Sequence, residues 1–140
     1  MFVSTVSVRF GDCDGLGHVN NAMYYTYMEE AREAVFRIFN PSMKLETWNL
    51  IVVSTRCDYL RQVGFAEKLT IYTWISRLGN SSFTVDHALA NQNGEWVARG
   101  QAVLIGYDYE REQASPLTDA IQQALKTHME APEGAPTLRP

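Results

Sequence analysis

The sequence has few cysteines, and their number and spacing do not suit a fold held together by disulfide bonds. Its 140 residues contain only Cys13 and Cys57. Two distant cysteines form neither a disulfide framework nor the closely spaced pairs that ligate zinc. They are therefore interpreted as reduced thiols, as expected for a cytoplasmic protein.

Long apolar runs and basic clusters are also missing. No run approaches the roughly 18 apolar residues of a membrane span, so no membrane partner is expected. The first residues, MFVSTVSVRF, lack the basic and apolar regions of a signal peptide. Lys and Arg number 12 against 16 Asp and Glu, a net charge of -4. Without a basic run, no nucleic-acid partner is expected either.

What the chain does contain fits one α+β domain. A length of 140 residues with 46% apolar side chains supports a single core. We assign residues 1–128 to this domain. The segment 129–140 contains three of the five prolines and is expected to be a mobile C-terminal tail.

Apolar periodicity predicts the order of the elements. A strand over 2–10 precedes a helix over 22–39, whose apolar positions recur every three or four residues. Asn20 or Asn21 is the expected helix cap, and Asn40-Pro41 ends the helix. A second helix is expected to begin at Ser115-Pro116. Between the helices lie four strands, at 50–61, 68–78, 81–91 and 95–107.

These elements predict an antiparallel sheet wrapped around the long helix. The connections between the four strands are short, and short connections join antiparallel neighbours. Asn93-Gly94 is a strong hairpin signal. The broad apolar stripe of the helix must be buried, and the sheet is the available surface. Several strands are apolar on both faces, so a second subunit is expected to cover an outer face or an edge.

The segment FGDCDGLGHVNN, at 10–21, concentrates polar and turn-forming residues between the first strand and the helix. If the strand continues, Asp12 and Asp14 lie on one side of it. Glycines and the following helix start supply free N–H groups that favour negative charge. A carboxylate facing such donors suits attack on a polarised carbonyl. The alternatives are a purely structural turn, or a metal site formed by Asp12, Asp14 and His18.

The stretch FGDCDGLGHVNNAMYYTYMEEAR resembles the active-site segment of the 4-hydroxybenzoyl-CoA thioesterase family, which has the hotdog fold. The match runs from Asp14 through His18, Asn20 and Asn21 to Tyr24. The resemblance implies an acyl-CoA thioesterase that releases the free acid and CoA, with water as second substrate and no cofactor. It also implies a homo-oligomer, either a dimer or a dimer of dimers (a homotetramer).

The resemblance implies a role for each matching residue. Asp14 is the nucleophile or general base, and the Asn21 N–H polarises the thioester carbonyl. His18 positions the thioester or Asp14. The residues assigned to substrate binding are Gly17, Asn20, Tyr24 and Tyr25. No metal ligand is assigned.

Other functions and residues remain as alternatives. The chain can instead be a non-catalytic hotdog protein that holds an acyl thioester, or a hotdog dehydratase or hydratase. The acyl group of the substrate can be carried by acyl carrier protein instead of CoA. A helix carboxylate, Glu29 or Glu30, replaces the loop aspartate in some related hotdog enzymes. His87 is expected in the core and His128 on the surface. The candidates to contact CoA phosphates are Arg56, Arg61, Arg77 and Arg99.

Overall fold

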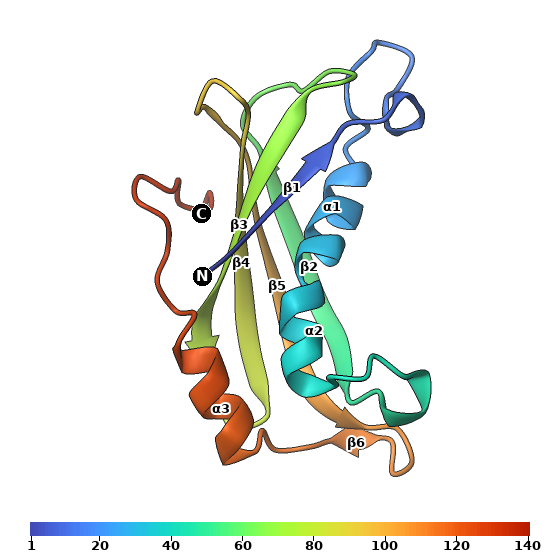
Figure 1. Cartoon of the computed structure of the whole chain (residues 1–140), viewed down its shortest axis with the longest axis vertical. Helices are drawn as coiled ribbons and strands as arrows, with labels where there is room; N and C mark the ends of the chain where they lie inside the picture. Colours follow the sequence, from blue (N-terminus) through green and yellow to red (C-terminus); the bar gives the residue numbers. More distant parts are fainter.

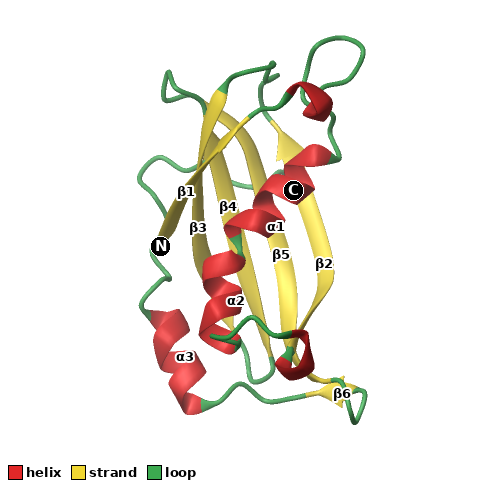
Figure 2. Ribbon diagram, turned by 45° about the vertical axis from the view of Figure 1, so that its right-hand side comes forward, coloured by secondary structure: helices red, strands yellow, loops and turns green.

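A six-stranded antiparallel sheet curves around one long helical rod (Figure 1, Figure 2). The computed structural model describes residues 1–140. The strands are β1 (Phe2–Ser7), β2 (Leu50–Tyr59), β3 (Lys68–Leu78), β4 (Ser82–Ala90), β5 (Trp96–Asp108) and β6 (Gln113–Ala114). The helices are α1 (Met23–Ala31), α2 (Glu33–Phe39) and α3 (Asp119–Lys126). The strand order is β1-β3-β4-β5-β2, with β6 paired to β5.

The rod formed by α1 and α2 lies against the inner face of the sheet (Figure 2). Tyr27 and Met28 of α1 are almost fully buried in one apolar cluster. Val35 and Phe39 of α2 anchor a second cluster, in which Phe39 stacks on Phe83 with ring centroids 5.1 Å apart. Each such side chain contributes roughly 1.5–3 kcal/mol. The α+β hotdog fold that the sequence predicts is confirmed.

The sequence predicted one continuous helix over 22–39, but the rod is interrupted. Regular helix stops at Ala31 and resumes at Glu33, and Arg32 between them has φ -80° and ψ -2°. The N–H of Arg32 is shared between the carbonyls of Met28 and Glu29. The regular helix is interrupted here while its apolar stripe stays on the sheet.

The start of the rod differs from its prediction and the end agrees with it. The cap residue of α1 is Ala22, which has no side-chain cap bond, and the Asn20 side chain accepts the Ala22 N–H at 2.9 Å in the turn before the helix. Regular helix ends at Phe39, before Asn40-Pro41, as predicted. The start of the rod is therefore fixed by the loop that precedes it, which also carries the candidate site.

The first strand is shorter than predicted. It ends at Ser7, and a 3-10 turn at Phe10–Asp12 follows it. The carboxylate of Asp12 holds this turn because it accepts the Arg9 N–H at 3.0 Å. The argument that a continuing strand puts Asp12 and Asp14 on one side therefore does not apply, because the strand ends before both residues.

The C-terminal region differs from its prediction in two ways. Helix α3 begins after Thr118, whose hydroxyl accepts the Ile121 N–H, instead of at Ser115-Pro116. The N–H groups of Ser115 and Leu117 bond to carbonyls of Gly106 and Asn80, so this segment stays extended along the sheet. Helix α3 begins only after these hydrogen-bonded residues.

The tail over 129–140 lies against the sheet instead of extending away from it. Arg99 donates from Nε to the Pro136 carbonyl at 2.7 Å, and the Arg139 N–H donates to Asp58 at 2.7 Å. His128, expected on the surface, stacks on Phe2 with ring centroids 3.8 Å apart. None of the helices has the length and apolar character required to cross a membrane.

Candidate active site

The two aspartates of the polar loop have separate environments. Asp12 is 4% exposed and accepts the Tyr27 hydroxyl at 2.7 Å. Burial alone would raise the pKa of Asp12, but the hydrogen bonds from Tyr27 and Arg9 outweigh it and hold the pKa below its usual value. Asp12 therefore fastens the loop to α1.

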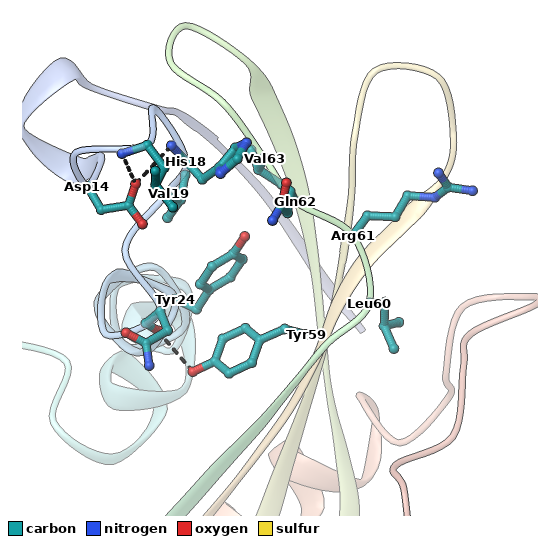
Figure 3. Close-up of a pocket in the computed structure, with 11 residues that line it drawn as sticks. Asp14, His18, Val19, Tyr24, Tyr59, Leu60, Arg61, Gln62 and Val63 are labelled. Atoms are coloured by element: carbon teal, nitrogen blue, oxygen red, sulfur yellow. Dashed lines mark hydrogen bonds between the residues drawn. The ribbon is translucent and has the colours of Figure 1, made fainter.

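Asp14 is exposed and faces a cavity. One of its carboxylate oxygens accepts the backbone N–H of Leu16 at 2.8 Å and that of His18 at 3.3 Å (Figure 3). The main chain closes the same turn, because the Asp14 N–H donates to the His18 carbonyl at 2.8 Å. These bonds fix the carboxylate and leave its second oxygen without a protein partner.

The start of α1 lies across the cavity from this carboxylate. The Asn21 N–H makes no hydrogen bond within the protein, whereas the N–H of its neighbour Ala22 donates to the Asn20 side chain. The Asn21 carbonyl accepts the Tyr59 hydroxyl at 3.0 Å, which ties this turn to the end of β2 (Figure 3). A free N–H at a helix start is suited to stabilise negative charge.

The cavity has a volume of about 350 Å³. It lies between the polar loop, the first turn of α1 and the segment that leaves β2 (Figure 3). Desolvation raises the pKa of Tyr24 and of Tyr59 to about 12, so both stay neutral. The lining residues are Asp14, Leu16, His18, Val19, Asn21, Tyr24, Tyr59, Leu60, Arg61, Gln62 and Val63.

This arrangement can support acyl transfer. A carbonyl held against the helix start has an N–H available to its oxygen, and a fixed carboxylate lines the same cavity. One oxyanion donor of this kind is worth roughly 2.7–4 kcal/mol. A carboxylate that activates water contributes about 10²–10⁴-fold. The cavity combines a polar wall with aromatic side chains against which an acyl group can pack.

Seven residues were assigned to catalysis or substrate binding from the sequence; four of them line the cavity and three do not. Asp14, His18, Asn21 and Tyr24 line the cavity. The lining does not include Gly17, Asn20 and Tyr25. Gly17 has a positive φ of 81° that shapes the loop, the Asn20 side chain accepts the Ala22 N–H, and Tyr25 lines another cavity.

Sequence reasoning missed the wall that follows β2. Tyr59, Leu60, Gln62 and Val63 were assigned to a strand end and a turn, and only Arg61 was considered as a ligand contact. Pairing brings this segment to the loop, because the Val19 N–H donates to the Val63 carbonyl at 2.8 Å. The available signal was an aromatic residue, Tyr59, near the end of the strand predicted over 50–61.

Other candidates lie elsewhere. Glu29 and Glu30 are exposed on the rod and do not line this cavity. His87 is fully buried, as predicted for a core histidine. The structure has no group of three or more His, Cys, Asp or Glu side chains placed to hold a metal ion.

Comparison with known proteins relates the whole domain to one family. The model of the thioesterase-like superfamily matches residues 8–125. A 1,4-dihydroxy-2-naphthoyl-CoA hydrolase of Synechococcus is 29% identical over 136 residues, which cover 89% of this chain and 88% of that protein. The family match extends from the residue after β1 into α3, so it includes every wall of the cavity.

Two solved structures superpose on most of the chain. A predicted thioesterase from Bacillus stearothermophilus has a TM-score of 0.90 and 28% identity, with 94% of this chain and 98% of that one covered. A thioesterase from Thermus thermophilus, solved with coenzyme A and Zn, has a TM-score of 0.79 and 35% identity. That comparison covers 89% of this chain and 96% of the other.

Proposed function

The chain belongs to the thioesterase-like superfamily, and from this premise we propose that it hydrolyses acyl-CoA thioesters to the free acid and CoA. The observation that carries the proposal is the cavity shared by the fixed Asp14 carboxylate and the free Asn21 N–H. The hydrolase and thioesterase relatives support the reaction class.

The thioester carbonyl is placed with its oxygen at the Asn21 N–H and its carbon facing Asp14. The free oxygen of Asp14 then either attacks that carbon or takes a proton from an attacking water. The carbon–sulfur bond breaks, and CoA leaves as a thiolate that needs no strong acid. In the first route water hydrolyses the resulting anhydride, and in the second the acid forms directly. His18 lies beside Asp14 and is assigned to position the thioester.

The finer parts of the proposal rest on the resemblance of the loop to the 4-hydroxybenzoyl-CoA thioesterase family. Water is the second substrate and no cofactor takes part. The working protein is proposed to be a cytoplasmic homodimer or a dimer of dimers, with residues 1–128 forming the catalytic domain. Tyr24 lines the acyl part of the cavity.

Thioester turnover tests the function directly. The purified protein is mixed with acetyl-, decanoyl- and benzoyl-CoA and a thiol-reactive dye, and release of CoA is expected with at least one of them. Tight binding without thiol release contradicts the proposal and favours a protein that only holds thioesters. Loss of enoyl-CoA absorbance identifies a hydratase. The same acyl groups on acyl carrier protein decide between the two carriers.

We assign the contact with the CoA phosphates to Arg61. It lines the cavity with a side chain that is 57% exposed and forms an ion pair with Glu95 at 3.1 Å. The other three candidates do not line the cavity. Arg99 is buried against Asp86, Arg56 bonds to Asp58 and the tail, and Arg77 bonds to Ser82.

Replacing Arg61 by alanine is expected to raise the KM for an acyl-CoA by roughly 5–10-fold and to leave kcat nearly unchanged. An exposed cation–phosphate contact contributes about 1 kcal/mol to binding, and salt weakens it. Steady-state kinetics at low and high ionic strength measure the effect. Arg77→Ala removes the same charge away from the cavity and serves as the control. An equal KM for Arg61→Ala and the control contradicts the assignment.

A further inference from the structure

The C-terminal tail is attached to the sheet mainly through one residue. Three of the four hydrogen bonds between the tail and the sheet involve Arg139. The Arg139 N–H donates to the Asp58 carboxylate at 2.7 Å, and the Arg139 carbonyl accepts from Arg56 at 2.8 Å. The guanidinium of Arg139 donates to the Tyr59 carbonyl at 3.3 Å. All of these contacts lie at the C-terminal end of β2.

The tail makes these contacts on the outer face of the sheet, away from the rod. Asp58 pairs with Arg99 in the register of β2 and β5, and directly opposite residues lie on the same face. Arg99 also holds the tail, because its Nε donates to the Pro136 carbonyl at 2.7 Å. The next pair, Tyr59 and Ala98, faces the rod, since Ala98 belongs to the apolar cluster around α1. One step along β2 therefore leads from the tail to the active-site side of the sheet.

Tyr59 joins the end of β2 to the start of α1. Its ring lines the active-site cavity and lies against the ring of Tyr24, with centroids 5.1 Å apart. Its hydroxyl donates to the Asn21 carbonyl at 3.0 Å (Figure 3). The N–H of the same residue, Asn21, is the donor assigned to the thioester oxygen. A displacement of Tyr59 therefore moves the residue that carries this N–H and changes one wall of the cavity.

We propose that Arg139 is a positioning residue for acyl-CoA hydrolysis, because it holds Tyr59 and, through Tyr59, the Asn21 N–H. This inference rests on the proposed function. Arg139 does not line the cavity. Its bonds fix the main chain of the β2 end from the outer face, while the Tyr59 side chain fixes the helix start on the inner face. A displacement of about 1 Å at such a site can lower the rate by ~10²-fold.

The contacts of Arg139 are suited to local positioning more than to overall stability. Arg139 is exposed, and exposed polar contacts contribute little to the free energy of unfolding. The chain that leaves β2 also has other anchors, because the N–H groups of Leu60 and Arg61 both donate to the Val97 carbonyl. These bonds keep the segment on β5 when Arg139 is changed. Loss of Arg139 is therefore expected to loosen Tyr59 without unfolding the sheet, and to reduce the rate moderately.

A direct contact of Arg139 with the CoA phosphates is a less suitable role. Its guanidinium already donates to the Tyr59 carbonyl, and it does not line the cavity, whereas Arg61 does. Loss of a phosphate contact weakens substrate binding and raises KM, and salt reduces that difference. Loss of a positioning contact lowers kcat instead. Steady-state kinetics at two ionic strengths therefore separate the two roles.

Replacing Arg139 by proline tests the proposal in the full-length chain. Arg139→Pro removes both the N–H that Asp58 accepts and the guanidinium. It is expected to lower kcat by ~3–10-fold and to leave KM within ~2-fold of wild type. Arg139→Ala keeps the N–H and is expected to lower kcat by a smaller factor. The control, Arg111→Ala, removes the same charge from an exposed ion pair with Asp108 at the other end of β5, and neither constant is expected to change.

A double variant tests whether the effect passes through Tyr59. Tyr59→Phe removes the hydroxyl that donates to the Asn21 carbonyl but keeps the ring, and is expected to lower kcat by ~5–10-fold. Combined with Arg139→Pro, it is expected to stay within ~2-fold of Tyr59→Phe alone. Losses that multiply show two independent effects and overturn the proposal. A kcat of Arg139→Pro equal to wild type, or a change confined to KM, also overturns it.

Hydrogen exchange gives a second readout that needs no turnover. In Arg139→Pro the amides of 20–25 and 59–63 are expected to exchange at least ~3-fold faster than in wild type, and those of α3 at an unchanged rate. Unchanged exchange at the start of α1 overturns the proposal. If the wild type hydrolyses no acyl-CoA, the proposed function fails, and exchange alone decides whether Arg139 holds the helix start. If Arg139→Pro does not fold in a thermal melt, the same measurements on Arg139→Ala decide.

Discussion

Asp14→Asn is expected to reduce the turnover of an acyl-CoA thioester by at least ~10²-fold. The carboxylate is the group assigned to attack the thioester carbon or to take a proton from water, and it lines the cavity. An amide oxygen of similar size has neither the charge nor the basicity for these steps. The measurement is kcat from release of free thiol at saturating acyl-CoA.

The fold is expected to survive this change. One oxygen of Asp14 accepts the N–H groups of Leu16 and His18, and an asparagine side-chain oxygen accepts the same two bonds. The second oxygen has no protein partner to lose. A thermal unfolding midpoint close to that of wild type therefore belongs to the prediction and separates lost chemistry from lost structure.

His18→Ala is the comparison within the same loop. Its side chain lines the cavity, but its fixed contacts to Asp14 are made by its main chain, which alanine retains. Its loss of kcat is expected to be smaller than that of Asp14→Asn. Near-wild-type turnover by Asp14→Asn removes this residue from the mechanism. An equal loss in His18→Ala instead gives the imidazole a central role.

Short-range patterns in the sequence were sufficient for most of the fold. Strand alternation and helical periodicity depend on neighbouring residues. They predicted the long rod and the four strands after it, with ends within one or two residues of those observed. The errors lie where tertiary contacts replace local preference. Ser115-Pro116 would begin a helix in isolation, but hydrogen bonds to Gly106 and Asn80 keep that segment extended.

The candidate site was predictable only in part, for the same reason. The loop and the helix start adjoin in sequence, so Asp14, His18 and Asn21 were found together. The opposite wall, from Tyr59 to Val63, comes from a distant strand, and its position depends on pairing that no local pattern encodes.

Asp86→Ala is expected to lower the free energy of unfolding by about 3 kcal/mol, the lower end of the cost of breaking a buried ion pair. Asp86 is 3% exposed and bonds to Arg99, Ser76 and Gln101. Its removal leaves the Arg99 guanidinium buried with only backbone carbonyls as hydrogen-bond partners, among them that of Pro136. Urea unfolding followed by circular dichroism measures the change.

Two further variants separate the charge from the contacts. Glu33→Ala breaks the Arg37 pair, whose side chains are both more than half exposed, and is expected to cost under about 0.5 kcal/mol. Asp86→Ala combined with Arg99→Met removes both buried charges and is expected to recover part of the loss. A single Asp86→Ala as mild as Glu33→Ala would show that this sheet tolerates an uncompensated buried arginine.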